Sequence, residues 1–132
     1  MKIASWNVNS IKARLDYVLN YCQNSSMDVL LMQEIKTLDE NFPKNSFEDI
    51  GWQVVTHGQK TYNGVAIASK KDIEVTQIGL PGDDADEQAR YIEAQIKGIT
   101  LASIYLPNGN PFPGQKFEYK LAWMDRLYDR AK

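Results

Sequence analysis

Lys2-Ile3-Ala4-Ser5-Trp6-Asn7-Val8-Asn9 opens the chain, and the run Asp28-Val29-Leu30-Leu31-Met32-Gln33-Glu34 follows about one helix later. Each is a short apolar segment with the character of a buried strand, and each ends on a polar residue. A strand, a helix and a strand in so short a length favour a right-handed parallel crossover. Asn7 and Glu34 are therefore expected at the carboxyl ends of two neighbouring parallel strands.

The segment between these strands has the periodicity of an amphipathic helix. Ser10 is suited to be its N-cap, and Asn24-Ser25-Ser26 ends the pattern. The apolar side chains that recur at helical spacing are Ile11, Leu15, Val18 and Cys22.

Asn7 and Glu34 offer oxygen ligands at the rim where open α/β sheets usually bind their ligands. Mg²⁺ prefers oxygen ligands and often takes only one or two carboxylates together with substrate phosphate oxygens. A metal site built from thiolates or imidazoles is excluded, because the chain has only one cysteine and one histidine, far apart in sequence. Taken singly, Glu34 is better explained as a salt-bridge partner and Asn7 as a turn former. Their pairing on one rim favours a metal site.

The remainder of the chain predicts further strands and a final helix. Lys70-Lys71-Asp72 separates two of the strands and Lys97-Gly98 two others, which indicates two hairpins. A short helix is expected after Pro43, and the last helix carries an apolar stripe of Phe117, Leu121, Met124, Tyr128 and Ala131. The expected strands are residues 52–56, 65–69, 73–78, 91–96 and 99–105. The fold class is α/β, with a mixed sheet and flanking helices.

Composition restricts the class of protein. The 132 residues suffice for one domain with a core. The net charge of −2 and the pI near 5.4 argue against holding nucleic acid by bulk charge, although a local basic surface remains compatible with them. No membrane-spanning run or secretory signal is present in the sequence, and the single cysteine is typical of a reduced protein, so we expect a cytoplasmic location and no membrane partner.

Several other side chains are candidates for phosphate chemistry. Tyr105 ends a strand, so its phenol is placed to donate to a phosphoryl oxygen, or to act as an acid or nucleophile if a cation lowers its pKa. Lys36 is a candidate to orient Glu34 or to approach a phosphate. The residues suited to a DNA backbone are Lys12, Arg14, Tyr62, Asn63, Arg90 and Asn108. Considered one at a time, these are explained equally well or better as ordinary surface residues. His57 has no acidic partner nearby in sequence and is interpreted as structural.

Six segments together carry a family resemblance. Trp6-Asn7-Val8-Asn9-Ser10-Ile11-Lys12-Ala13-Arg14, Gln33-Glu34-Ile35-Lys36, His57-Gly58-Gln59-Lys60, Tyr62-Asn63-Gly64-Val65-Ala66-Ile67, Pro81-Gly82-Asp83-Asp84 and Tyr105-Leu106-Pro107-Asn108-Gly109 occur in this order. The set resembles the exonuclease III class of apurinic/apyrimidinic endonucleases, within the wider endonuclease/exonuclease/phosphatase superfamily. The matching segments cover most of the chain. Each segment alone is weak evidence for the family, but together they are quite specific to it.

The resemblance implies a Mg²⁺-dependent phosphodiesterase, with Mn²⁺ as a second candidate metal. Asn7 and Glu34 match metal-holding positions, with Lys36 beside them, and Tyr105 matches a catalytic tyrosine near the scissile phosphate. Lys12, Arg14, Tyr62, Arg90 and Asn108 match positions on or near the DNA-binding face. The implied reaction is hydrolysis 5′ to an abasic site in double-stranded DNA, together with 3′→5′ removal of nucleotides and of 3′ blocking groups.

Two departures from the family pattern stand out. Ile35 occupies a position where many relatives carry threonine, which we expect to perturb the surroundings of Glu34 slightly. Family members are also considerably longer, and their later half supplies an Asp-x-Asn segment that activates water and a late Asp-His pair. We expect neither in this chain. The last helix moreover reaches Lys132 without a stop signal. We therefore expect residues 1–132 to be the N-terminal half of a four-layered α/β sandwich, with the C-terminal half of the single domain absent.

Half a sandwich has physical consequences. Without a positioned base, metal and phosphate contacts alone do not support efficient attack by water. One sheet would also leave an apolar face uncovered. We expect the chain alone to have little nuclease activity and to self-associate, whereas the full-length enzyme would be monomeric.

Two alternatives remain open from the sequence. The first is a truncated remnant that binds DNA or metal without catalysis. The second is a phosphodiesterase of the same superfamily that acts on another phosphate ester, such as a phospholipid, an inositol phosphate or RNA.

Overall fold

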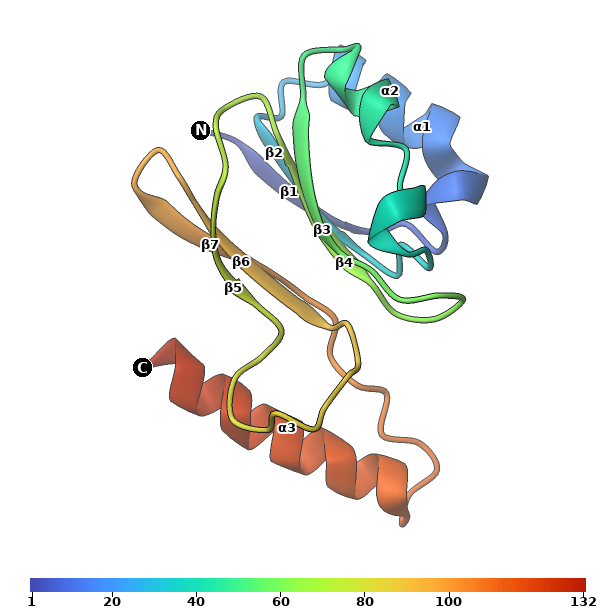
Figure 1. The fold of residues 1–132 in the computed structure, drawn as a ribbon, viewed down its shortest axis with the longest axis vertical. Helices are drawn as coiled ribbons and strands as arrows, with labels where there is room; N and C mark the ends of the chain where they lie inside the picture. Colours follow the sequence, from blue (N-terminus) through green and yellow to red (C-terminus); the bar gives the residue numbers. More distant parts are fainter.

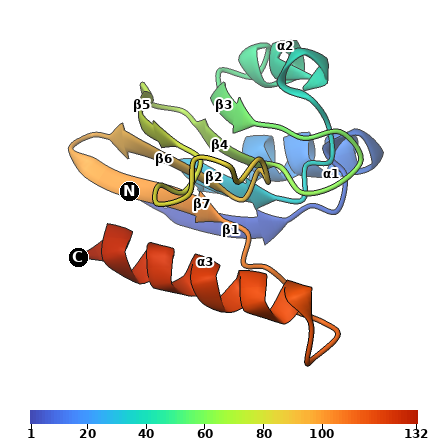
Figure 2. The same ribbon diagram turned by 60° about the horizontal axis from the view of Figure 1, so that its bottom comes forward.

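The computed structural model describes residues 1–132 as four layers, two sheets enclosed by helices (Figure 1). α1 and α2 lie outside one sheet, and α3 lies along the far face of the other (Figure 2). None of the helices is long and apolar enough to cross a membrane. The elements are β1 (Ile3–Asn7), α1 (Ile11–Asn24), β2 (Val29–Gln33), η1 (Asp39–Asn41), α2 (Lys44–Glu48), β3 (Gln53–His57), β4 (Val65–Ser69), β5 (Glu74–Ile78), β6 (Tyr91–Ile96), β7 (Ile99–Ile104) and α3 (Gln115–Ala131).

The first sheet, called here the mixed sheet, has the strand order β1-β2-β4-β3. β1 and β2 run parallel, with Asn7 opposite Gln33, so the predicted crossover through α1 is confirmed. Ser10 caps α1 as expected, because its hydroxyl accepts a 3.3 Å hydrogen bond from the Ala13 N–H. The carboxyl ends of β1 and β2 therefore share one rim.

The second sheet, called here the antiparallel sheet, has the order β5-β6-β7. The predicted hairpin around Lys97-Gly98 is confirmed as β6 and β7. The predicted hairpin of β4 with β5 is wrong, because β5 pairs with β6 instead. β4 is buried along its whole length and both its edges are occupied, by β2 and β3, so no edge is left for β5. The α/β class with a mixed sheet is confirmed, and the second sheet adds a layer to it.

Three apolar cores fill the three spaces between the four layers. The first lies between the mixed sheet and its helices and includes Ile11, Val18 and Trp52. The second joins the two sheets and includes Val29, Ile67 and Ile92. The expectation of a sheet face left uncovered is wrong for this reason: the antiparallel sheet packs on it. The third core lies under α3 and includes Leu80, Tyr91 and Trp123.

α3 forms as predicted, but it buries a different face from the predicted one. Trp123 is 1% exposed and is joined in the third core by Tyr119 and Leu127. The stripe expected to be buried is on the solvent side, with Leu121 at 44%, Met124 at 44% and Tyr128 at 67% exposure. Periodicity identified the helix correctly but did not identify which face packs.

Two arginines of α3 fix its orientation on the antiparallel sheet. Arg126 Nη1 lies 2.9 Å from Asp86 Oδ2, and its guanidinium also donates to the Leu80 and Pro81 carbonyls. Arg130 Nη2 lies 2.8 Å from Glu93 Oε2. Because both carboxylates are largely buried, these charge-assisted bonds are directional constraints that an apolar stripe alone would lack.

The Glu93 network predicts loss of stability in acid. The hydrogen bond from Arg130, followed by those from the Tyr91 and Thr76 hydroxyls, lowers the pKa of Glu93 to about 2. Since the folded pKa lies below the unfolded one, the stabilisation is complete above about pH 4.5 and is lost as the pH falls towards 2. The loss is on the order of 3 kcal/mol. Urea unfolding between pH 7 and 2.5 measures it.

Glu93→Gln should be less stable than the parent at pH 7 and lose less stability in acid. Glu48→Gln is the matched control, because Glu48 is exposed on α2 and makes no ion pair. Its curve should follow the parent. A Glu93→Gln curve that runs parallel to the parent curve over the whole range would contradict the role given to Glu93.

Candidate metal and nucleic-acid site

Asn7 and Glu34 meet at the shared rim of β1 and β2. Asn7 Nδ2 donates a hydrogen bond to Glu34 Oε2, while Asn7 Oδ1 accepts the Asn9 N–H at 3.1 Å. The side chain of Glu34 is 22% exposed, so its carboxylate remains accessible from solvent. The structure thus brings together the two residues that the strand ends predicted to be neighbours.

The backbone around this pair is held in an uncommon conformation. Asn9, Ser10, Glu34, Lys36 and Asn63 all have positive φ angles, between 46° and 83°. Side chains other than glycine rarely adopt such angles, and they persist where surrounding contacts enforce them. Clustering of five such residues around one pair of side chains is typical of a functional site.

Backbone hydrogen bonds between the rim loops enforce this conformation. The Ser10 N–H donates to the Glu34 carbonyl at 2.8 Å, and the Lys36 N–H donates to the Asn63 carbonyl at 2.9 Å. Gly64 permits the second contact, since it has φ +92° and a Cβ there would lie 2.5 Å from Ile35 Cγ1. The loops after β1, after β2 and before β4 are therefore tied into one unit.

Ile35, the noted departure from the family pattern, is fully buried in the first core. Its side chain packs against the Gly64 backbone, so it supports the loop that carries Glu34.

Lys36 lies beside the pair as predicted. Its Nζ donates to Asn9 Oδ1 at 2.7 Å and is 3.9 Å from Glu34 Oε1. Both Asn9 and Glu34 are thereby linked to the same ammonium group, which helps to orient the carboxylate.

Tyr105 follows β7 and brings the antiparallel sheet to the site. The Arg90 guanidinium lies 4.9 Å from the centre of the Tyr105 ring, and Arg90 Nη1 donates to the Tyr105 carbonyl at 3.3 Å. Burial, then the charge of Glu34 and a hydrogen bond to it, raise the pKa of the Tyr105 phenol, with Arg90 opposing. With its pKa raised, the phenol is a hydrogen-bond donor at neutral pH.

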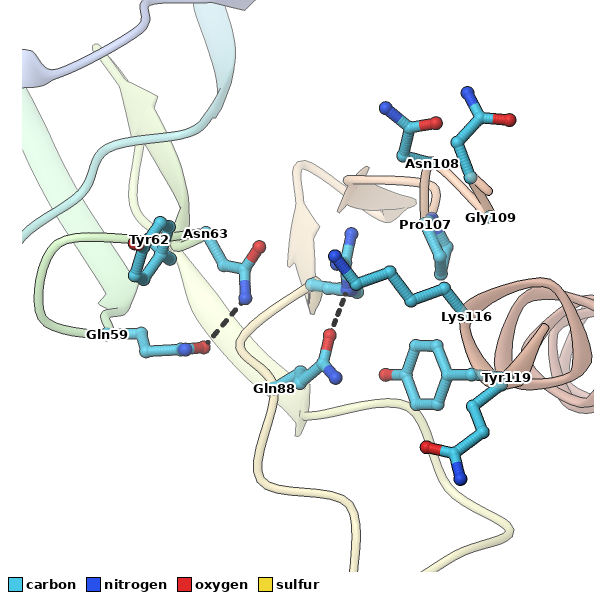
Figure 3. A pocket seen from close by; sticks show the side chains of 12 residues that line it. Gln59, Tyr62, Asn63, Gln88, Pro107, Asn108, Gly109, Lys116 and Tyr119 are labelled. Carbon is cyan, nitrogen blue, oxygen red and sulfur yellow. Dashed lines mark hydrogen bonds between the residues drawn. The ribbon is translucent and has the colours of Figure 1, made fainter. Parts of the chain in front are cut away.

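An open pocket of about 630 Å³ adjoins the Arg90–Tyr105 contact (Figure 3). Four of the six predicted DNA-contacting residues line it: Tyr62, Asn63, Arg90 and Asn108. Figure 3 shows that Tyr62 and Asn63 approach from one side, whereas Asn108 and the α3 side chains Lys116 and Tyr119 approach from the other.

The other two predicted DNA-contacting residues lie elsewhere. Lys12 and Arg14 are exposed near the start of α1, and neither lines the pocket or makes an ion pair. The structure leaves both charges available but does not bring them together with the other four.

Sequence reasoning missed the pocket residues that support Arg90 and Asn63. Gln88 Oε1 accepts from Arg90 Nε at 2.8 Å. Gln59 Oε1 accepts from Asn63 Nδ2 at 3.0 Å and from the Ala89 N–H at 2.9 Å. Gln59 lies within a segment that carried the family resemblance, which was a usable signal. Lys116 and Tyr119 gave none, because only the fold brings α3 to this pocket.

The expectation that the chain has no Asp-x-Asn segment is wrong, because Asp39-Glu40-Asn41 is one. It forms η1, and Asp39 Oδ1 accepts 2.7 Å hydrogen bonds from Thr56 Oγ1 and the Gly58 N–H. η1 is thus bound to β3, the opposite edge of the mixed sheet from β1, about 14 Å away by strand spacing. Asp39 is engaged in local structure and is not part of the Asn7–Glu34 pair.

His57, interpreted from the sequence as structural, ends β3. Burial lowers the pKa of its imidazole, and the charge of Asp39 opposes that shift. Its place at the far edge of the mixed sheet sets it apart from Asn7 and Glu34.

The residues at the rim fit a hard cation. Asn7 carries an amide oxygen and Glu34 a carboxylate, and the hydrogen bond from Asn7 Nδ2 to Glu34 Oε2 places the two side chains side by side. No group of three or more histidine, cysteine, aspartate or glutamate residues is placed to bind a metal. A pair of oxygen donors is compatible with Mg²⁺, which retains waters, but not with a closed zinc site.

Solved structures share this fold and extend beyond it. The chain is 43% identical to an AP endonuclease from Archaeoglobus fulgidus, with a TM-score of 0.92 over 98% of this chain and 50% of that one. It is 40% identical to a 3′ phosphatase from Neisseria solved with a product DNA hairpin, with a TM-score of 0.95 over the same shares.

Relatives defined by sequence agree with the structural matches. Exodeoxyribonuclease III of Haemophilus influenzae is 36% identical over 113 residues, which are 83% of this chain and 42% of that protein. The chain thus spans about half the length of the relatives it matches. The model of the endonuclease/exonuclease/phosphatase family matches residues 4–131. The chain belongs to the endonuclease/exonuclease/phosphatase family.

Proposed function

We propose that this chain provides half of the active site of a Mg²⁺-dependent DNA repair nuclease. The reaction is phosphodiester hydrolysis at abasic sites and 3′→5′ removal of nucleotides from double-stranded DNA. The observation that carries the proposal is the bonded Asn7–Glu34 pair, with Tyr105 and the Arg90 pocket beside it. Similarity to exodeoxyribonuclease III and to AP endonucleases supports it.

Asn7 and Glu34 would hold the metal, and a bound Mg²⁺ supplies Lewis-acid polarisation of a phosphoryl oxygen. Mn²⁺ has similar ligand preferences and is the second candidate. Lys36 orients the Glu34 carboxylate, and the neutral Tyr105 phenol is placed to donate a hydrogen bond to a phosphate oxygen.

DNA would lie across the pocket that Tyr62, Asn63, Arg90 and Asn108 line. Arg90 is held on two sides, by Gln88 and by the Tyr105 ring and carbonyl, so its guanidinium is preorganised for a phosphate. Lys12 and Arg14 would extend the contact as separate charges on α1.

The chain alone would cleave DNA weakly. The chain forms no group of three or more histidine, cysteine, aspartate or glutamate side chains placed to bind a metal, and efficient attack by water needs a positioned general base beside the metal. This is the reason for proposing half a site, with the complementary groups supplied by further sequence.

Glu34→Gln tests the metal site. Removal of the carboxylate charge should weaken Mg²⁺ and Mn²⁺ binding by about tenfold or more, measured by titration calorimetry. Glu48→Gln, at an exposed glutamate with no ion pair, is the matched control and should bind as the parent does. Unchanged affinity in Glu34→Gln would exclude Glu34 as a ligand.

A cleavage assay on abasic duplex accompanies this titration and separates the alternatives. Little or no cleavage is expected from residues 1–132, and robust Mg²⁺-dependent cleavage that Glu34→Ala abolishes would contradict the half-site proposal. A panel of phospholipid, inositol phosphate and RNA substrates tests whether the chain acts on another phosphate ester. A chain that binds duplex DNA but cleaves no substrate, even when the complementary half is added, would be a non-catalytic remnant.

Arg90→Ala tests the DNA surface. Because the guanidinium would neutralise one phosphate, its loss should weaken duplex binding about equally for all sequences and reduce the salt slope by about 1. Fluorescence anisotropy at several salt concentrations measures both quantities. Lys71→Ala removes an exposed charge near the start of β5, far from the pocket lining, and should leave the slope nearly unchanged. A salt slope in Arg90→Ala equal to that of the parent would remove Arg90 from the interface.

Self-association of the isolated chain is the remaining proposal, and the exposed stripe of α3 supports it. Leu121→Gln combined with Tyr128→Ser should shift the chain towards monomer in sedimentation velocity, because apolar surface drives association. Tyr17→Ser is the control, since Tyr17 on α1 is 70% exposed, close to the 67% of Tyr128. A parent chain that is monomeric at high concentration would contradict the proposal.

A further inference from the structure

A small polar cluster crosses the apolar interface between the two sheets. Gln33 Nε2 donates to Ser103 Oγ and to Ser5 Oγ, each at 3.1 Å. Ser103 Oγ in turn donates to the Met32 carbonyl at 2.8 Å. Gln33 is 8% exposed and Ser103 is fully buried, so the bonds of Ser103 lie away from water, whereas Ser5 is on the exposed side of β1. Polar groups in such an interface are costly unless they are hydrogen-bonded, so the cluster needs an explanation.

Each member lies just before a residue of the candidate site. Ser5 precedes Asn7 by two residues on β1, Gln33 directly precedes Glu34 on β2, and Ser103 precedes Tyr105 by two on β7. One carboxamide therefore joins the three strands that end in the three key side chains. Two of these strands belong to the mixed sheet and one to the antiparallel sheet.

Apart from the hydrogen bonds of Ala89 with Gly64 and Gln59, which join the segments before β4 and β6, the rest of the contact between the sheets is apolar. The core between them is aliphatic, with members such as Val29, Ile67 and Ile92. The stabilisation from aliphatic packing depends on the buried area and not on direction, whereas hydrogen bonds fix both distance and angle. The strand ladders run within each sheet, and the backbone hydrogen bond from the Gly64 N–H to the Ala89 carbonyl at 2.8 Å joins the segments before β4 and β6, so neither ties β7 directly to β2.

We propose that Gln33 is a positioning residue that fixes Tyr105 relative to Asn7 and Glu34. Its amide nitrogen has two hydrogens, which suit one hydroxyl acceptor on each sheet. A glutamate in its place would have no donor for Ser5 or Ser103 and would add a buried negative charge next to Glu34. The effect on metal binding rests on the proposed function, whereas the geometric role does not.

Gln33→Met tests the geometric role, because it keeps the length of the side chain and removes the donors. In the metal-free protein, NMR signals of the Asn7 side-chain amide report its hydrogen bond to Glu34, and ring signals of Tyr105 report its surroundings. Both should move towards the positions of exposed residues. Gln53→Met is the matched control: Gln53 lies on β3 and its Nε2 bonds Asp72 at 2.8 Å, remote from the rim. It should leave both signals unchanged.

Mn²⁺ affinity, measured by titration calorimetry, is the second readout. Gln33→Met should weaken binding by about tenfold, as loss of an orienting partner does. Ser103→Ala removes one acceptor at lower risk to folding and should weaken binding in the same direction. Combined with Gln33→Met it should add less than it does alone, because both changes break the Gln33–Ser103 bond and only the Ser103–Met32 bond is lost in addition.

The proposal is overturned if the NMR signals of Asn7 and Tyr105 keep their parental positions in Gln33→Met, whatever the change in stability. If Gln33→Met does not fold, the same comparison is made in Ser103→Ala. If Glu34→Gln binds Mn²⁺ as the parent does, the proposed metal site fails instead, and the NMR comparison still decides the role of Gln33.

Discussion

The packing of the antiparallel sheet on the mixed sheet is the constraint on which the candidate site depends. Asn7 and Glu34 belong to one sheet, and Tyr105 with Arg90 belongs to the other. Neither sheet alone brings the Asn7–Glu34 pair together with the Tyr105 phenol and the Arg90 guanidinium. The apolar core between the sheets supplies the adhesion, and the Gln33 cluster at its rim supplies a fixed alignment.

Local sequence was sufficient to predict one half of this arrangement. The β1-α1-β2 unit is contiguous, and the handedness rule for parallel crossovers leaves one placement for its strand ends. The meeting of Asn7 and Glu34 follows from that rule together with the apolar runs that precede them. The hairpin of β6 and β7 could also be predicted from the sequence, because Lys97-Gly98 is a strong turn signal between two strands.

The parts that could not be predicted depend on competition between distant segments. β5 looked like the hairpin partner of β4, but β2 and β3 had already taken both edges of β4. α3 has apolar residues around much of its circumference, and the buried face was selected by Trp123 together with Asp86 and Glu93. Lys116 and Tyr119 line the pocket because α3 has that orientation, so their contribution also could not be predicted from the local sequence.

The same orientation explains how an acidic chain can present a pocket lined by cationic side chains and no acid. The net charge of −2 counts all carboxylates equally. Two of them, Asp86 and Glu93, are turned inward and neutralised by Arg126 and Arg130, so they project little negative field. The pocket lining contains two cationic residues, Arg90 and Lys116, and no acid. Affinity for a phosphate backbone depends on this local balance at the contact, which the net charge of the chain does not describe.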